Sequence, residues 1–193
     1  MKLILASRNT NKVREIKSML GSKFQVLSLS DLPFKGEIQE TASTIEENSM
    51  IKARKVYEVY RIPCIGDDSG LEVDALDGKP GVRSARYAGD QRDDKKNIQK
   101  LLKQLSKYPS KTARFKCVIS YVDNYDCQQF TGIVKGVICS ELKGDNGFGY
   151  DPIFIPENHD RTFAQMDTHV KNFISHRSQA IKKFARHMHI NKT

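Results

Sequence analysis

The sequence has no hydrophobic run long enough to cross a membrane. A transmembrane helix needs roughly 20 consecutive apolar residues, and the first apolar run, Leu3 to Ala6, is also too short for a signal peptide. The 193 residues contain no internal repeat, low-complexity segment or linker. We therefore expect a cytoplasmic protein without a membrane partner, and one domain spanning residues 1–193.

Cysteine is scarce and is not arranged for metal binding. There is no C-x-x-C pair, no histidine lies at zinc spacing, and the four cysteines are far apart: Cys64, Cys117, Cys127 and Cys139. Isolated cysteines of this kind are usually reduced thiols, mostly in the core. A catalytic cysteine stays open as an alternative, although no feature singles one out.

Acidic residues are fewer than basic ones. Thirty-two Lys and Arg against 23 Asp and Glu give a formal charge of +9, which favours polyanionic partners such as nucleic acid, an acidic membrane surface or nucleotide phosphates. The charge is scattered, as is common on soluble proteins, and the interleaved aromatic and basic residues of a nucleic-acid platform are missing. Nucleic-acid binding is therefore an alternative that the charge favours and the motifs do not.

Apolar patterns predict an α/β fold. Runs or alternation of apolar residues predict strands at 3–6, 24–29, 71–76, 113–123, 128–139 and 154–155. Helical spacing predicts helices at 13–20, 45–60, 93–106 and from 171 onward. Because the ribbon formed by 113–139 interrupts the strand–helix alternation, we expect an elongated, mixed β-sheet flanked by helices.

The first predicted strand runs into a polar loop and then a helix. Backbone N–H groups at a helix N-terminus can bind an anion, and Arg8 and Lys12 would add positive charge. The loop lacks the glycines of a Walker motif, so an ordinary strand-to-helix loop capped by Asn or Thr is an equal alternative.

Two adjacent carboxylates, Asp67 and Asp68, follow the apolar stretch 62–65. Adjacent acids repel each other and sit poorly in a sheet, so their place at the end of a predicted strand calls for a compensating cation or solvent. Mg²⁺ prefers carboxylate oxygens and often bridges substrate phosphates. A solvated turn is the alternative, because Gly, Asp and Ser are common turn residues.

Two later segments are also candidates for ligand binding. The glycine-rich segment 144–152 contains Phe148 and Tyr150, so backbone could approach a flat ligand while a ring stacks on it; a plain glycine-rich loop is the alternative. Ser175-His176-Arg177 places two basic residues at a helix start, where the dipole disfavours them. An acceptor from a ligand would explain them, although Ser175 could simply be the N-cap.

Taken in this order, these segments resemble the HAM1/inosine triphosphatase family of non-canonical purine nucleoside triphosphate pyrophosphatases, from residue 3 to residue 186. The matching residues are Ser7 to Lys12 with Glu15, Glu40-Thr41, Glu47-Asn48 with Lys52, Asp67 to Gly70, Pro80-Gly81 with Ser84-Ala85-Arg86, Phe148 to Pro152, and Ser175 to Arg177. The sequence departs from the family pattern in two places. In the first loop, Arg8 and Asn11 stand where glycines are usual, and Ala42 replaces the glycine that commonly follows Glu-Thr.

The resemblance implies an inosine triphosphatase-like fold, a homodimer, and Mg²⁺-dependent hydrolysis of ITP, dITP or XTP to the monophosphate and pyrophosphate. It implies that Asp68 is the general base or water-orienting carboxylate, and that Glu40 and Asp68 hold the metal. The substrate-binding residues it implies are Ser7, Arg8, Asn9, Thr10, Asn11, Lys12, Lys52, Ser69, Phe148, Gly149, Tyr150, Asp151, Lys171, His176 and Arg177. The roles of Asp67 and Glu47 stay open.

The resemblance also suggests how a purine would be selected. Donors from His176 and Arg177 would suit a 6-oxo group and would leave a 6-amino group facing donors, which is costly when buried. This argument excludes ATP but not GTP. A Maf-like nucleotide pyrophosphatase is the alternative enzyme, and Ser175-His176-Arg177, which belongs to the purine-selective pattern, argues against it.

Overall fold

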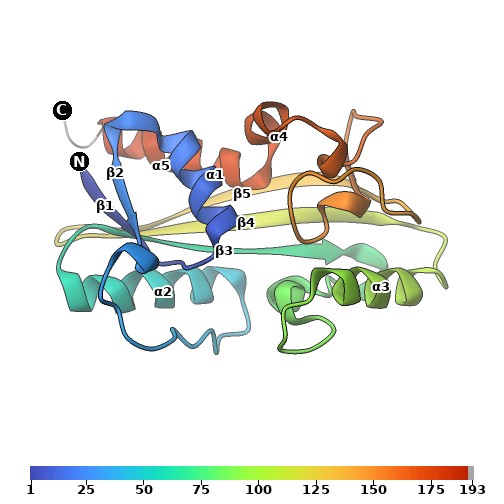
Figure 1. The fold of residues 1–193 in the computed structure, drawn as a ribbon, viewed down its shortest axis with the longest axis horizontal. Coiled ribbons are helices and arrows are strands. Elements are labelled where there is room, and N and C mark those ends of the chain that lie inside the picture. The colour runs from blue at the N-terminus through green and yellow to red at the C-terminus, as the bar shows by residue number, and fades with distance from the viewer. Residues whose placement is uncertain (191–193) are drawn as a thin grey trace. The chain divides into compact units, whose positions relative to one another are not determined.

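A computed structural model describes residues 1–190 of the chain (Figure 1). The strands are β1 (Lys2–Leu5), β2 (Gln25–Ser28), β3 (Cys64–Val73), β4 (Thr112–Val122), β5 (Cys127–Ile138) and β6 (Phe154–Pro156). The α-helices are α1 (Thr10–Leu20), α2 (Ile45–Tyr60), α3 (Asp94–Leu105), α4 (Thr168–Ile174) and α5 (His176–Ile190). Within residues 1–190, no helix has the length and apolar character needed to cross a membrane.

The strands form a six-stranded sheet in the order β2-β1-β3-β4-β5-β6. The pairing of β1 with both β2 and β3 is parallel, whereas β5 and β6 are antiparallel. The predicted mixed sheet with flanking helices is therefore confirmed.

Tertiary contacts divide the chain into two compact units, each assembled from separate segments. The first unit consists of Met1–Asp68, Cys117–Gly132 and the chain from Arg177 on, and the second of Ser69–Lys116 and Ile133–His176. The strands β3, β4 and β5 contribute residues to both units. The single domain spanning residues 1–193 stays a prediction.

In the first unit, helices cover both faces of the strands. Leu5 and Ile65 belong to a buried cluster with α1 and α5, whereas Ile4 and Cys64 pack with α2. Figure 1 shows α1 and α5 on one side of β1 and β3, and α2 on the other. Because successive side chains of a strand point to opposite faces, a strand covered on both sides is apolar throughout, as was predicted for 3–6.

The second unit has its own core. Leu101 of α3 is buried with Leu71 of β3 and with Phe115 and Phe154. The last two rings meet edge to face, with centroids 4.7 Å apart, a geometry that aromatic pairs prefer. The predicted helix 93–106 and the predicted strand 113–123 are both confirmed to within one residue.

The structure corrects the expectation for β3. The sequence predicted that one strand stops before Asp67 and that another begins at Leu71, but β3 runs unbroken from Cys64 to Val73. The two acids fit inside a strand because alternation sends their side chains to opposite faces, where each meets its own cation. The turn alternative for Asp67 and Asp68 is therefore wrong.

The C-terminal helix also differs from its prediction. A single helix was expected from Lys171, but α4 ends at Ile174 and α5 begins at His176. Ser175 lies between them in an extended conformation, with φ −64° and ψ 157°. An extended residue interrupts helical backbone hydrogen bonding, so α4 and α5 are separate helices.

Candidate functional site

Asp67 lies at the centre of a buried ion cluster in the first unit. Arg177 Nε donates a hydrogen bond to Asp67 Oδ2 at 2.8 Å, and Lys12 Nζ donates to Asp67 Oδ1. Burial by itself would raise the pKa of Asp67, but Arg177 and Lys12 together hold it well below its usual range. The ionised form of Asp67 is therefore favoured by two fixed cationic partners.

Arg177 links α5 to α1. Its Nη1 atom donates a hydrogen bond to Glu15 Oε2 at 2.6 Å, and the residue is 1% exposed. Burial opposes the charge, yet Asp67 and Glu15 raise the pKa of Arg177 well above its already high value. Removing one member would leave a buried charge without its partner, which is strongly destabilising.

Lys12 is positioned by the start of α1. Asn9 is the N-cap of this helix, and its side-chain oxygen accepts a hydrogen bond from Lys12 N at 3.1 Å. Burial would lower the pKa of Lys12, but Asp67 and Asp68 outweigh this effect and raise it. The capping role predicted for the loop is confirmed, while phosphate binding by the loop stays a prediction.

Arg8 anchors a neighbouring loop. Its Nη1 and Nη2 atoms donate hydrogen bonds to the carbonyl oxygens of Gly36 (2.8 Å) and Phe34 (2.6 Å), and its guanidinium lies 5.6 Å from the centroid of the Phe34 ring. Asn11 accepts a hydrogen bond from Arg14 at 3.2 Å. Arg8 and Asn11, which replace usual glycines of the first loop, thus have local partners. Their contact with substrate stays a prediction.

Asp68 lies on the other face of β3, toward α2. Lys52 Nζ donates a hydrogen bond to Asp68 Oδ1 at 2.7 Å and lies 3.5 Å from Glu40 Oε1. Burial raises the pKa of Asp68 and outweighs the lowering effect of Lys52 and Lys12. A carboxylate with a raised pKa accepts a proton more readily than an exposed aspartate does, which suits a general base.

Glu40 and Asp68, the predicted metal ligands, share the ammonium group of Lys52. Both carboxylates therefore lie close enough to face one cation, and their oxygens are the hard donors that Mg²⁺ prefers. Among residues 1–190, no group of three or more His, Cys, Asp or Glu is arranged to hold a metal ion. Two carboxylates suit Mg²⁺ when phosphate oxygens and water complete its shell.

The N-terminal part of α2 orders the chain around Lys52. The Thr44 hydroxyl accepts a hydrogen bond from Glu47 N at 3.2 Å and donates one to Glu47 Oε2 at 2.9 Å. Asn48 holds the preceding loop through two hydrogen bonds to the backbone of Ala42, at 3.0 and 3.1 Å. Thr44 is therefore the N-cap of α2, and Glu47 takes part in this cap.

A second cluster surrounds Asp151 in the second unit. Lys171 Nζ donates a hydrogen bond to Asp151 Oδ2 at 2.6 Å, and the Phe148 N–H donates to the same oxygen at 2.8 Å. Lys171 Nζ also lies 4.9 Å from the centroid of the Phe148 ring. The cluster thus combines a donor, an acceptor and an aromatic ring.

The loop that carries Phe148 is tied down at two further points. Gly149 N donates a hydrogen bond to Asp94 Oδ2 at 2.8 Å, and the Tyr150 hydroxyl donates to Ser84 O at 2.9 Å. Tyr150 is buried, whereas Phe148 is half-buried, so Phe148 is the more accessible ring for stacking. Sequence reasoning missed Asp94, because an acid at a helix start is already explained by the helix dipole.

His176 and Arg177, predicted to act together on a purine, have different surroundings. The His176 ring stacks on Phe115 in the second unit, with centroids 4.7 Å apart and an interplanar angle of 9°. Arg177 belongs to the first unit, where Asp67 and Glu15 engage two of its nitrogens. The joint contact of these residues with a base stays a prediction.

The other predicted site residues divide between the two units. In the first unit lie Ser7, Arg8, Asn9, Thr10, Asn11, Lys12, Glu40, Lys52 and Asp68. In the second lie Ser69, Phe148, Gly149, Tyr150, Asp151, Lys171 and His176. The structure thus brings together two sets: Lys52 with Glu40 and Asp68, and Lys171 with Asp151 and Phe148.

The fold is a mixed sheet with flanking helices. Buried lysines lie beside carboxylates, and the Phe148 ring lies beside the Lys171–Asp151 pair. These features define an α/β protein equipped for a phosphorylated aromatic ligand. The chain belongs to the Ham1 family, whose model matches residues 3–187. The family resemblance of the sequence motifs is thereby confirmed.

Individual relatives agree with this membership. The dITP/XTP pyrophosphatase of Flavobacterium johnsoniae is 50% identical over 185 residues, which cover 95% of each chain. That of Bacillus subtilis is 43% identical over 187 residues, covering 95% of this chain and 94% of the relative. Among solved structures, the Ham1 protein of Staphylococcus aureus matches with a TM-score of 0.91 at 39% identity, covering 100% of both chains.

Proposed function

We propose that this protein hydrolyses the non-canonical purine nucleoside triphosphates ITP, dITP and XTP to the monophosphate and pyrophosphate, and so keeps deaminated purines out of DNA and RNA. The observation that carries the proposal is Asp68, a buried carboxylate of raised pKa that is bonded to Lys52 opposite Glu40. The names of the relatives from Flavobacterium johnsoniae and Bacillus subtilis support it.

In the proposed reaction, water attacks the α-phosphorus and pyrophosphate leaves. Asp68 orients this water and accepts its proton, while Lys12 and Lys52 bind phosphate oxygens. Glu40 and Asp68 would hold Mg²⁺, which supplies neutralisation of phosphate charge when it is bound. Because Lys52 bonds Asp68, it also fixes the orientation of the base.

Asp67 and Arg177 have a positioning role in this proposal. Asp67 holds Lys12 from one side of β3, and Arg177 holds Asp67. A fixed ammonium group stabilises charge on phosphate without reorganising during the reaction. The contribution of Arg177 to catalysis thus passes through Asp67 and Lys12.

Lys171 and Asp151 provide the proposed selectivity for 6-oxopurines. A 6-oxopurine presents an acceptor (O6) beside a donor (N1–H), and the Lys171 ammonium and the Asp151 carboxylate present the complementary pair 2.6 Å apart. Adenine reverses both groups, so its amino group would face Lys171 and its N1 lone pair would face Asp151. Buried mismatches of this kind are costly, whereas the 6-oxo side of GTP matches.

We further propose a cytoplasmic homodimer that binds neither nucleic acid nor membrane. The four cysteines are free thiols, which fits a reducing compartment, and the homodimer rests on the resemblance to the family. Light scattering after size-exclusion chromatography tests the dimer: we expect about twice the 22.0 kDa of the chain. A mass of one chain would contradict it.

A single assay tests the activity. The protein is incubated with ITP, XTP, GTP, ATP and dTTP, with and without EDTA, and pyrophosphate is measured. We expect rapid release from ITP and XTP, slow release from ATP and dTTP, and loss of activity in EDTA. Release of orthophosphate alone, or equal rates on all five nucleotides, would refute the proposal, and preference for dTTP would favour a Maf-like enzyme.

A further inference from the structure

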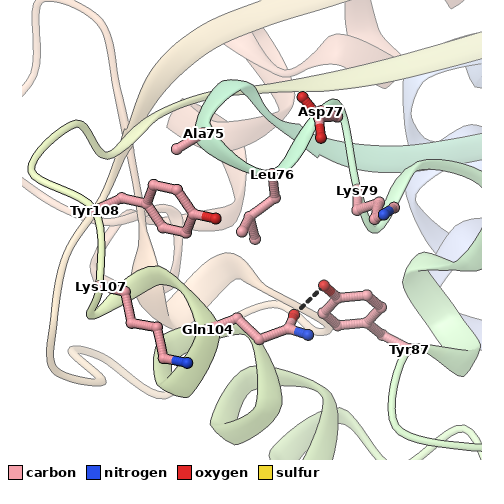
Figure 2. A pocket seen from close by; sticks show the side chains of 8 residues that line it. All are labelled: Ala75, Leu76, Asp77, Lys79, Tyr87, Gln104, Lys107 and Tyr108. Atoms are coloured by element: carbon pink, nitrogen blue, oxygen red, sulfur yellow. Dashed lines mark hydrogen bonds between the residues drawn. The ribbon is translucent and has the colours of Figure 1, made fainter.

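The second unit contains a cavity of about 290 Å³ that shares no lining residue with the clusters described above. Leu76, Asp77 and Lys79 line it from the turn that follows β3, and Gln104 lines it from α3. Figure 2 shows an aromatic ring and a lysine at each end: Tyr108 with Lys107 at one end, and Tyr87 with Lys79 at the other.

The Tyr87 ring is held in place by a hydrogen bond, and the backbone carbonyl of each tyrosine accepts a hydrogen bond from a lysine. The Tyr87 hydroxyl donates to Gln104 Oε1 (Figure 2), and Lys100 Nζ donates to Tyr87 O at 2.5 Å while lying 4.6 Å from the centroid of the Tyr87 ring. On the opposite side, Lys111 Nζ donates to Tyr108 O at 2.9 Å. Walls that are already ordered lower the entropic cost of binding a ligand.

The turn above the cavity is also well defined. Asp77 adopts the left-handed conformation, with φ 52°. Gly78 N donates a hydrogen bond to Val73 O and Lys79 N to Leu76 O, each at 3.0 Å. In Figure 2 the Leu76 side chain points from this turn into the cavity, opposite Gln104. The cavity therefore has an apolar side and a polar side.

The charged side chains that line the cavity have no ion-pair partner in the part of the chain that the structure describes. Lys79, Lys107 and Asp77 are exposed, and within residues 1–190 none of their side chains forms an ion pair. Two lysines against one aspartate make the lining net positive. A ligand that carries an anionic group would therefore gain ion pairs without breaking existing ones.

We propose that this cavity binds a nucleoside monophosphate. The base would stack on Tyr108, which is exposed, and the phosphate would meet Lys79 at the other end. The ribose would lie between Leu76 and Gln104. Pockets for small ligands measure roughly 300–1,000 Å³, and this pocket of about 290 Å³ is just below that range, so it would take a ligand no larger than one mononucleotide. The inference does not depend on the proposed hydrolysis of triphosphates.

Calorimetric titration of the full-length protein with AMP, in EDTA, tests this site. We expect saturable binding that is at least about tenfold tighter than that of adenosine or inorganic phosphate, because each lacks one half of the ligand. The double variant Lys79→Glu/Lys107→Glu should weaken AMP binding at least about tenfold. Lys103→Glu, at an exposed lysine of α3 outside the cavity lining, should leave it unchanged.

Tyr108→Ala provides a second test, since this ring is exposed at 42% and its removal should not affect folding. AMP affinity should fall while the melting temperature stays constant. Absence of AMP binding, equal affinity for adenosine and AMP, or unchanged binding in the double variant would each overturn the site. None of these results bears on pyrophosphate release from ITP, so the two proposals can fail separately.

Discussion

Arg177 Nε donates a hydrogen bond to Asp67 Oδ2 at 2.8 Å, deep in the first unit. The bond joins the start of α5 to β3, and Glu15 of α1 accepts a second bond from the same guanidinium. On the opposite face of β3, the adjacent Asp68 is bonded to Lys52 of α2. Two neighbouring acids thus organise two lysines from different helices.

Arg177→Met should lower the free energy of unfolding by about 3–5 kcal/mol. The buried carboxylates of Glu15 and Asp67 would each lose the guanidinium as a partner. Urea denaturation measures the loss. Arg186→Met, on the same helix but exposed, is the matched control and should change stability little. Equal effects of the two substitutions would contradict the buried cluster.

The kinetics of Arg177→Met separate the two roles considered for Arg177. A positioning residue that acts through Asp67 and Lys12 should lower kcat for ITP and ATP alike, leaving their ratio of kcat/KM unchanged. A direct contact with the base, as the sequence motif predicts, should narrow that ratio instead. Assays on folded protein, well below the melting temperature of the variant, decide between them.

Asp68→Asn should lower kcat by about 10²–10⁴, the usual contribution of general acid–base catalysis, while substrate binding is largely kept. The amide preserves the size of the side chain but cannot accept the proton from water. Single-turnover measurements of pyrophosphate release, with binding measured separately, test this. Asp160→Asn, whose side chain is 95% exposed, serves as the control. A near-normal kcat for Asp68→Asn would exclude its role as base.

The raised pKa of Asp68 should be measurable in the metal-free protein. An exposed aspartate has a pKa of about 3.9, and burial raises that of Asp68. In NMR of the carboxyl carbons in EDTA, with Asp68→Asn to assign the signal, Asp68 should therefore titrate at a higher pH than this ordinary value. A titration midpoint at or below the ordinary value would contradict the assignment.

The stability of the fold should also depend on pH through these two acids. Asp67, whose pKa is lowered, stabilises the fold above the unfolded-state pKa of about 3.9, and this contribution is lost as the pH falls below that value. Asp68 acts in the opposite direction, because its raised pKa favours the folded state at low pH. The free energy of unfolding, measured from pH 6 down to pH 2, should therefore decrease by less than Asp67 alone would cause.

Lys171→Met should narrow the preference for ITP over ATP in kcat/KM by about tenfold, because the donor to O6 is lost while the apolar stem is kept. The kcat/KM for ITP should fall, whereas that for ATP should not fall, because its amino group no longer faces Lys171. Lys143→Met, an exposed lysine of the same unit, is the matched control. An unchanged ratio in Lys171→Met would remove this lysine from base selection.

Much of the fold could be predicted from local patterns. Helix α2 spans the predicted range 45–60, and the ribbon of β4 and β5 follows the predicted alternation. These features depend on neighbours in sequence, namely capping groups and the period of apolar residues. The continuity of β3 through Asp67 and Asp68 could not be predicted in this way, because it depends on cations from distant helices.

The sequence by itself determined the class of fold, the motifs and their chemical types: carboxylates at Asp67 and Asp68, and basic residues at Lys12, Lys52 and Arg177. Only the tertiary structure decided how they pair. It assigned Asp67 to Lys12 and Arg177, and Asp68 to Lys52. The physical reason is that the alternation of side chains along a strand depends only on neighbouring residues in the sequence. The partner of a buried charge, in contrast, is whichever opposite charge the folded chain brings within hydrogen-bonding distance.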